Sequence, residues 1–167
     1  MSASLSVALT GNPNTGKSTI FNELTGARQK IGNWPGVTVD KKVGYVRHND
    51  KDIMIVDLPG TYSINARSPE EKIVIDYLLT THTDLVVDVV DSSNIERNLY
   101  LTLQLLEQGI PLIIDLNMQD EAEKRGIKID VKKLEAYPGY PVLLTIARDG
   151  KSLKNMLNVF TSISMEG

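Results

Sequence analysis

The stretch Gly11-Asn12-Pro13-Asn14-Thr15-Gly16-Lys17-Ser18 decides the fold of this 167-residue chain. It matches the pattern G-x-x-x-x-G-K-[ST] in full, in which a glycine-rich loop turns its backbone N–H groups toward phosphate oxygens. The apolar run Leu5–Thr10 predicts a buried strand before it, and a helix through Leu24 is predicted after it. In such loops the lysine contacts the β- and γ-phosphates and the final hydroxyl binds Mg²⁺. We therefore expect Gly11–Ser18 to hold a nucleoside triphosphate.

Short apolar runs alternate with helical patterns along the rest of the chain, which is typical of α/β domains. Lys42–Arg47 and Ile53–Val56 predict two strands joined too closely for a crossover helix, so they should form an antiparallel hairpin. Three more strands are predicted, at Leu85–Val90, Leu112–Leu116 and Val142–Thr145. Together these patterns predict an α/β fold with a six-stranded, mostly parallel sheet that has one antiparallel strand and helices on both faces.

Ser68 begins the best-marked helix, with Pro69 at the first helical position and Glu71 expected to reach back to the cap. Further helices are predicted at Arg97–Glu107, Val131–Ala136 and Ser152–Phe160. Gln29–Val39 and Leu58–Arg67 show no periodicity, so we expect both to be loops. Ligands on such sheets bind at the carboxyl ends of the strands, where every motif described below falls.

Composition is that of an ordinary globular domain and excludes several kinds of site. Hydrophobic residues make up 41% and charged residues 23% of the chain. The net charge of -3 argues against nucleic acid as the partner, because phosphate neutralisation needs a basic face. With no cysteine, the chain has no disulfide, thiolate metal site or cysteine nucleophile. The apolar runs Leu85–Val90 and Ile110–Ile114 fall far short of the ~20 residues that span a bilayer.

A second acidic motif, Asp57-Leu58-Pro59-Gly60, follows the predicted strand Ile53–Val56. Asp57 can bind Mg²⁺ through a water molecule, and Gly60 can offer its backbone N–H to a γ-phosphate because no side chain blocks the approach. Between the two motifs lies Gly36-Val37-Thr38, where GTPases place the threonine that completes Mg²⁺ coordination. We expect this loop to be ordered by the γ-phosphate, although Thr38 could equally be an ordinary strand-entry residue.

Guanine selection is predicted for Asn117-Met118-Gln119-Asp120, after the strand Leu112–Leu116. A carboxylate at Asp120 can accept from the N1–H and the exocyclic amine of guanine, and adenine offers no such donor pair. Asn117 should tie this loop to the phosphate loop, while Met118 covers the base where GTPases usually have lysine. At the end of the last predicted strand, Ile146 and Ala147 are candidates for a backbone contact with the guanine O6.

Hydrolysis needs a device other than the usual glutamine, because Thr61 stands directly after the D-x-x-G motif. One candidate is Asn14, whose side-chain oxygen could hold a monovalent cation against the phosphates. The alternative is that Asn14 only closes a turn.

These motifs together resemble FeoB, the bacterial family of ferrous iron transport proteins. The match is most specific at Gly32–Val39 (GNWPGVTV), with support from Asp57–Ser63 (DLPGTYS) and Asn94–Leu101 (NIERNLYL). Ordinary GTPases lack the first and last of these segments. The resemblance covers nearly the whole chain.

The resemblance implies a Ras-like P-loop GTPase fold, forming a G domain over residues 1–167, at the cytoplasmic face of the bacterial inner membrane. Its partners would be guanine nucleotide and the helical and transmembrane domains, which follow in the family and which we expect to be absent from this chain. Self-association stays open. The resemblance also implies GTP and GDP as ligands, with Mg²⁺, and K⁺-stimulated hydrolysis through Asn14. It further implies a slow intrinsic rate and nucleotide-dependent changes around Thr38 and Asp57.

Three residues depart from the family pattern. Ile146 stands where serine is usual, which bears on nucleotide release. Asp88 and Asp115 fall in predicted buried, neighbouring strands where the family has uncharged residues. Two close buried carboxylates should repel, so we expect one to stay protonated unless both reach water at the nucleotide edge.

Other functions are compatible with parts of the sequence. A ribosome- or RNA-associated GTPase can also lack the glutamine, but it usually carries a basic appendage, which this sequence does not have. A P-loop ATPase or small-molecule kinase is disfavoured by Asp120. A nucleotide-binding scaffold without turnover would differ in a hydrolysis assay containing K⁺.

Overall fold

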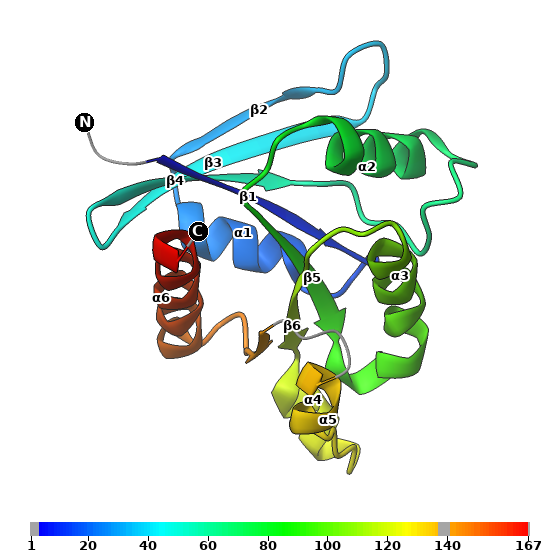
Figure 1. The fold of residues 1–167 in the computed structure, drawn as a ribbon, viewed down its shortest axis with the longest axis vertical. Coiled ribbons are helices and arrows are strands. Elements are labelled where there is room, and N and C mark those ends of the chain that lie inside the picture. The colour runs from blue at the N-terminus through cyan, green and yellow to red at the C-terminus, as the bar shows by residue number, and fades with distance from the viewer. Residues whose placement is uncertain (1–3, 137–140, 167) are drawn as a thin grey trace.

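A seven-stranded sheet forms the centre of the molecule in a computed structural model that describes residues 4–136 and 141–166 (Figure 1). The spatial order is β2-β3-β4-β1-β5-β6-β7. Strand β3 pairs antiparallel with both of its neighbours, and every other pairing is parallel. The strands are β1 (Ser4–Gly11), β2 (Gln29–Asn33), β3 (Asp40–His48), β4 (Lys51–Asp57), β5 (Leu85–Asp91), β6 (Ile113–Asn117) and β7 (Val142–Leu144).

The predicted count of six strands was wrong, because Gln29–Asn33 forms the edge strand β2 and not a loop. Its residues pair in antiparallel register with β3, from Gln29 opposite Gly44 to Asn33 opposite Asp40. Most of β2 is exposed, including Ile31, so no buried face imposes the alternating pattern by which a strand is recognised. The backbone ladder alone holds this segment to the sheet.

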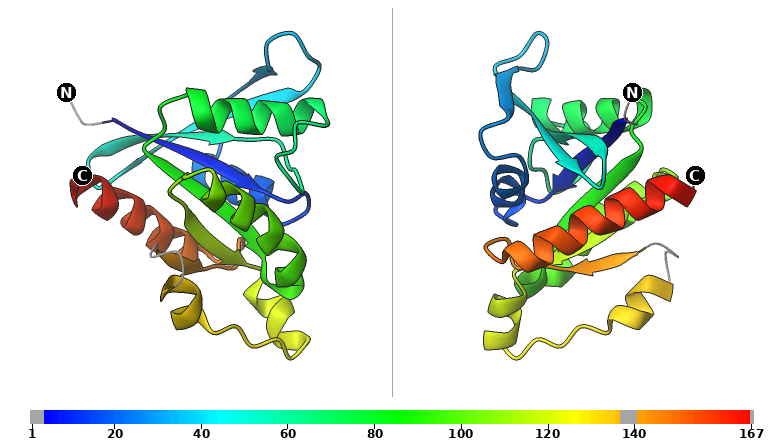
Figure 2. Two further views of the ribbon diagram at one scale, coloured as in Figure 1. Left: turned by 45° about the vertical axis from the view of Figure 1, so that its right-hand side comes forward. Right: turned by 90° about the vertical axis from the view of Figure 1, so that its left-hand side faces the viewer.

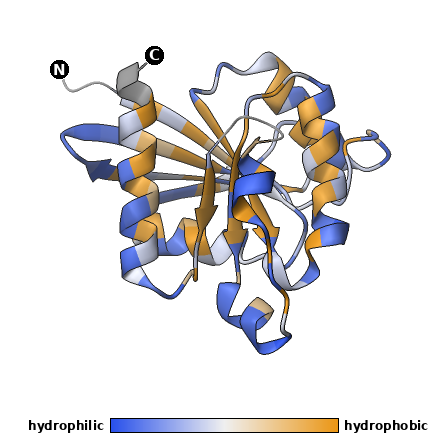
Figure 3. Ribbon diagram, turned by 60° about the horizontal axis from the view of Figure 1, so that its bottom comes forward, coloured by the Kyte–Doolittle hydropathy of each residue, from blue (hydrophilic) through white to orange (hydrophobic). Residues whose placement is uncertain are grey.

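Helices cover both faces of the sheet, as predicted (Figure 2). On one face, α1 and α6 pack in a cluster with β1, β4 and β5. On the other, α2 and α3 pack over β1, β4 and β5, and α5 packs beside α3 over β6. Figure 3 shows apolar strands in the middle and helices whose apolar sides turn toward them. The helices are α1 (Lys17–Thr25), α2 (Pro69–Thr80), α3 (Ile95–Glu107), α4 (Gln119–Lys124), α5 (Val131–Ala136) and α6 (Gly150–Glu166), with a 3₁₀ turn η1 (Ser92–Asn94).

The start of α2 confirms half of its predicted cap. Ser68 Oγ accepts a hydrogen bond from the backbone N–H of Glu71 at 3.1 Å, and Pro69 is the first helical residue. The Glu71 carboxylate does not reach back to the cap. It accepts instead from Ser63 Oγ and from the backbone N–H of Asn65, each at 3.0 Å. Glu71 therefore fastens the loop after β4 to the first turn of α2.

Among the described residues, no helix has both the length and the apolar character that crossing a bilayer requires.

Candidate functional site

The phosphate loop joins the end of β1 to the start of α1 and forms one wall of a pocket. Glycine is required there by space as well as by conformation. A Cβ on Gly16, whose φ is +87°, would lie 2.3 Å from Asn117 Nδ2, and a Cβ on Gly11 would lie 2.5 Å from Val89 O. The pocket is lined by Asn12, Pro13, Asn14, Gly16, Lys17, Ser18, Thr19 and Gly60. Apart from Thr19, all of these residues were predicted to contact nucleotide.

Unpaired buried polar atoms mark the same loop as a binding site. Both side-chain polar atoms of Asn12, and Thr15 Oγ1, are buried without a hydrogen-bond partner among the described residues. Such groups are rare in native proteins because desolvation without a partner is costly. Polar oxygens of a ligand would satisfy them, so the loop fits the phosphate-binding role expected of it. Asn14 is exposed and adopts a left-handed backbone with φ of 65°, a conformation that asparagine tolerates well.

Lys17, Ser18 and Asp57 meet beside this loop. Lys17 Nζ forms a buried ion pair with the Asp57 carboxylate and donates to Leu58 O at 2.6 Å. Ser18 Oγ lies 3.4 Å from the other Asp57 oxygen. The serine hydroxyl and the carboxylate are thus adjacent, as two ligands of one Mg²⁺ would have to be. The long lysine stem allows its ammonium group to exchange Asp57 for phosphate oxygens.

The D-x-x-G segment is fastened to the loop through its backbone. The N–H of Thr61 donates to Gly11 O at 3.0 Å, and Gly60 lines the phosphate pocket. The Leu58 side chain is buried in the core, so only its carbonyl faces the site, and Pro59 lines neither this pocket nor the one beside it. The Thr61 hydroxyl is buried and donates to Ser63 O at 2.6 Å, which commits it to the fold.

The segment around Thr38 is not brought to the phosphate pocket in this conformation. Gly36, Val37 and Thr38 are exposed in the turn between β2 and β3, which projects away from the phosphate loop (Figure 1). Trp34, just before them, is buried and makes an edge-on contact with Tyr77 of α2, with 5.6 Å between ring centroids. The tryptophan is therefore an anchor between this turn and α2.

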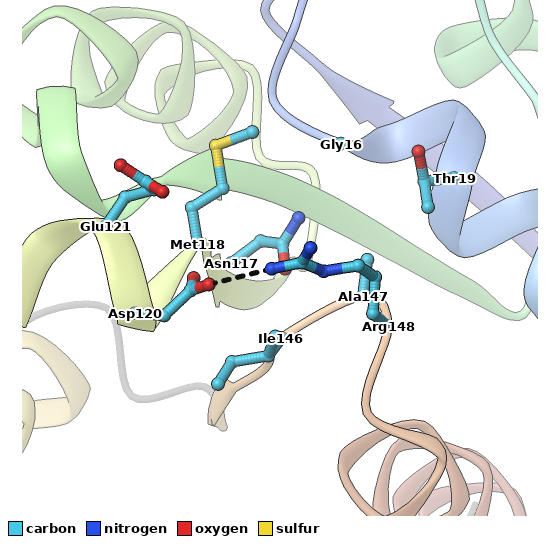
Figure 4. A pocket seen from close by; sticks show the side chains of 9 residues that line it. All are labelled: Gly16, Thr19, Asn117, Met118, Asp120, Glu121, Ile146, Ala147 and Arg148. Carbon is cyan, nitrogen blue, oxygen red and sulfur yellow. Dashed lines mark hydrogen bonds and ion pairs between the residues drawn. The ribbon is translucent and has the colours of Figure 1, made fainter.

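A second pocket adjoins the first at Gly16 and collects the residues predicted to read guanine (Figure 4). Asn117 Nδ2 donates to Thr15 O at 2.8 Å, the predicted tie to the phosphate loop. Met118, in a left-handed conformation with φ of 59°, ends β6 and places Asp120 in the first turn of α4. The lining residues are Gly16, Thr19, Asn117, Met118, Asp120, Glu121, Ile146, Ala147 and Arg148.

Arg148 is a member of this pocket that sequence reasoning missed. Its Nη2 lies 3.2 Å from Asp120 Oδ2, and its side chain is 82% exposed. Exposed ion pairs contribute little, so a base edge offering two donors can displace the arginine from Asp120 at small cost. Its position directly after Ala147, a predicted base contact, was the feature of the sequence that could have indicated it. Thr19 and Glu121 also line the pocket and were not predicted.

Asp88 and Asp115 are both fully buried; the expected repulsion is present, since the Asp88 charge raises the pKa of Asp115, but the two side chains do not share a face of the sheet. Their strands are neighbours, but Asp88 pairs with Ile114 and Asp115 pairs with Val89, so the two side chains leave opposite faces of the sheet. The Thr102 hydroxyl donates to Asp88, and the Thr145 hydroxyl lies 2.8 Å from Asp115 Oδ1. Burial raises the pKa of each carboxyl to about 7, and neither reaches water at the nucleotide edge.

Comparison with known proteins gives a consistent result. The family model described as "Ferrous iron transport protein B" matches residues 5–160. The curated Fe(2+) transporter FeoB of Shigella flexneri is 51% identical over 154 residues, covering 90% of this chain and 20% of that protein. The chain thus spans about a fifth of the length of the curated relatives it matches.

Solved structures agree in fold over nearly the whole of this chain. The cytosolic domain of the T. maritima FeoB iron transporter in GDP form I matches with TM-score 0.89 and 44% identity, over 95% of this chain and 62% of that one. The FeoB G-domain from Methanococcus jannaschii matches with TM-score 0.85 and 43% identity, over 96% of this chain and 97% of that one.

Proposed function

Because the chain belongs to the ferrous iron transport protein B family, we propose that it binds guanine nucleotide and hydrolyses GTP as the G domain of a bacterial ferrous iron transporter. The chain's own geometry supports this through one observation above all. Two pockets share Gly16, one lined by the phosphate loop and the other by Asn117 and Asp120, and the Asn117–Thr15 hydrogen bond joins them. A purine and its phosphates fit such a pair of sites.

Each side chain then has a defined part in binding. Asp120 accepts from the N1–H and amine of guanine once Arg148 moves aside, and Met118 lies against the base. The loop N–H groups hold the phosphates, and Lys17 leaves Asp57 for their oxygens. Ser18 and Asp57 would hold Mg²⁺, Asp57 through water, and the metal neutralises charge on the phosphates. The N–H of Ile146 or Ala147 would contact the guanine O6.

Hydrolysis is proposed to be slow without assistance, since Thr61 has no free hydroxyl with which to orient water. Asn14 is exposed at the mouth of the phosphate pocket, where its side-chain oxygen could hold K⁺ beside the phosphates. Thr38 would join the site, with the neighbouring Gly36 and Val37, when the turn between β2 and β3 closes over bound GTP. The helical and membrane domains of the same transporter would respond to such a closure, at the cytoplasmic face of the inner membrane.

Two measurements test this proposal. The first is a titration with fluorescent guanosine and adenosine nucleotides, in which guanosine should bind at least about tenfold more tightly. The second compares GTP turnover in KCl and NaCl for the wild type, Asn14→Ala and Asn14→Gly. Glycine keeps the left-handed backbone, so equal loss of K⁺ stimulation in both variants assigns the effect to the side chain. Turnover that is insensitive to K⁺ in the wild type would refute the cation role.

A further inference from the structure

A chain of buried polar groups connects the middle of β6 to the phosphate loop. Asp115 Oδ1 lies 2.8 Å from Thr145 Oγ1, and that same hydroxyl oxygen lies 3.1 Å from Asn117 Oδ1. Asn117 Nδ2 in turn donates to Thr15 O at 2.8 Å. All four residues are buried. This series of hydrogen-bonded groups therefore runs from Asp115 to the backbone of the phosphate loop without passing through solvent.

When Asp115 is ionised, this series of hydrogen-bonded groups has one donor hydrogen too few. The bond to Thr15 O fixes the orientation of the Asn117 amide, so its oxygen must face Thr145. The Thr145 hydroxyl has one hydrogen and two oxygen neighbours that can only accept. If that hydrogen goes to ionised Asp115, the oxygens of Thr145 and Asn117 face each other at 3.1 Å with nothing between them.

A proton on Asp115 removes the conflict. The carboxyl group then donates to Thr145 Oγ1, the Thr145 hydroxyl donates to Asn117 Oδ1, and Asn117 Nδ2 donates to Thr15 O. Each bond between the four residues then has one donor and one acceptor, and all bonds point toward the phosphate loop; Asp115 Oδ2 has no partner among the described residues. A buried carboxyl oxygen without a partner disfavours the ionised form further, because nothing there stabilises its charge.

We propose that Asp115 is a positioning residue for the guanine-binding loop, and that it acts in its protonated form by directing the Thr145 hydroxyl onto Asn117. This inference rests on the proposed nucleotide function, since Asn117 is the residue that joins the base pocket to the phosphate loop. It assigns a role to a carboxylate that contacts neither pocket directly.

The surroundings of Asp115 place its titration near neutral pH. Burial raises its pKa to about 7, helped by the negative charge of Asp88 across the sheet. The facing residues of β7 and α6 are apolar, namely Leu143, Leu153 and Met156. The other charged groups on the elements around it are paired, hydrogen-bonded or exposed: Lys17 with Asp57, Arg148 with Asp120, Asp91 with Ser93, and Glu23, Asp149, Lys151 and Lys154 at the surface.

The sign of the effect follows from linkage. If protonation of Asp115 favours the nucleotide-binding arrangement, nucleotide binding must favour protonation by the same factor. Guanine nucleotide affinity should therefore be highest below neutral pH and fall as pH rises through about 7. One buried hydrogen bond gained or lost corresponds to about a threefold to tenfold change in affinity.

The test is a titration with fluorescent GDP at about pH 6 and about pH 8, which lie on either side of the Asp115 pKa of about 7. The proteins are the wild type, Asp115→Asn, Thr145→Val and Asp88→Asn. The asparagine at 115 donates to Thr145 at every pH, so this variant should keep the tight binding that the wild type shows at low pH. The Thr145→Val variant has no hydroxyl to link Asp115 with Asn117, so it should bind GDP weakly at both pH values. Titration of the GDP phosphate is common to all four proteins and cancels in ratios.

Asp88→Asn is the matched control, because Asp88 is equally buried but bonded to Thr102 on the opposite face. It should keep a pH-dependent affinity, with the midpoint moved to lower pH because the Asp88 charge no longer raises the pKa of Asp115. An unchanged profile in Asp115→Asn, or a flat one in Asp88→Asn, would overturn the inference.

A measurement without nucleotide separates this inference from the proposed function. In the free protein, the side-chain amide signals of Asn117 in NMR should titrate with Asp115 in the wild type and in Asp88→Asn, but not in Asp115→Asn. If this titration is seen and GDP does not bind, the proposed function fails, but the coupling of Asp115 to Asn117 through Thr145 is supported. If the amide signals do not titrate, that coupling is refuted.

Discussion

Replacing Asp88 with asparagine should stabilise the fold more at alkaline than at acidic pH. Burial raises the pKa of Asp88 from 3.8 to about 7 in the folded chain. Between these values the folded state binds a proton that the unfolded state has lost, so stability falls as pH rises from about 4 to about 7. Above about pH 7 Asp88 is ionised in both the folded and the unfolded state, so the free-energy cost of burying its charge no longer changes with pH. Asparagine cannot ionise and can still pair with the Thr102 hydroxyl.

The size of the effect follows from the pKa difference. The shift from 3.8 to about 7 is roughly three units, each equivalent to about 1.4 kcal/mol, which bounds the penalty at about 4 kcal/mol. Part of this penalty is already present at about pH 5. The stability gap between Asp88→Asn and the wild type should therefore widen by about 2 to 3 kcal/mol between about pH 5 and about pH 8.

Urea unfolding followed by Trp34 fluorescence measures this gap, since urea carries no charge that would screen the effect. Asp76→Asn, at an exposed position on α2, is the control and should show no widening. A gap that stays constant over the same pH range would show that Asp88 ionises in the folded chain as it does in the unfolded one. Burial would then not raise the pKa of Asp88.

Three further predictions concern single side chains around the site and the loop beside it. Gly16→Ala should abolish nucleotide binding while the chain still folds by circular dichroism, because the new Cβ would lie 2.3 Å from Asn117 Nδ2. Ser68→Ala should lower the free energy of unfolding by about 1 kcal/mol in urea, since it removes the side-chain hydrogen bond that caps the N-terminus of α2. Arg148→Ala should raise guanine nucleotide affinity by about twofold to fivefold by calorimetry, because the base no longer competes with an exposed guanidinium for Asp120; weaker binding would contradict that competition.

Much of the architecture follows from local patterns that need no knowledge of the fold. The phosphate loop was recognisable because its two glycines meet strict steric demands, at Gly16 against Asn117 and at Gly11 against Val89. The cap at Ser68 was equally visible, since a serine followed by proline is a strong start signal for a helix. Strand β5 was recognisable from its valine-rich apolar run, which Asp88 alone interrupts and which burial on both faces favours.

The misses have a common physical origin in contacts between distant parts of the chain. Strand β2 is held by backbone pairing with β3, and its exposed side chains carry no alternation. The Glu71 carboxylate found partners at Ser63 and Asn65, a choice that depends on the path of the preceding loop. Strand register decided on which face Asp88 and Asp115 lie, and register cannot be read from either strand alone.

Asp120 is the group proposed to select guanine over other bases. Its clearest test is to measure the affinities of GDP and xanthosine diphosphate for the wild type and for Asp120→Asn. Xanthine has a carbonyl where guanine has its amine, and an asparagine amide can donate to that carbonyl, so the variant should lose GDP affinity by at least about tenfold and gain affinity for the xanthine nucleotide. If the variant keeps the wild-type preference for GDP, Asp120 does not read the base and the assignment of this pocket is wrong.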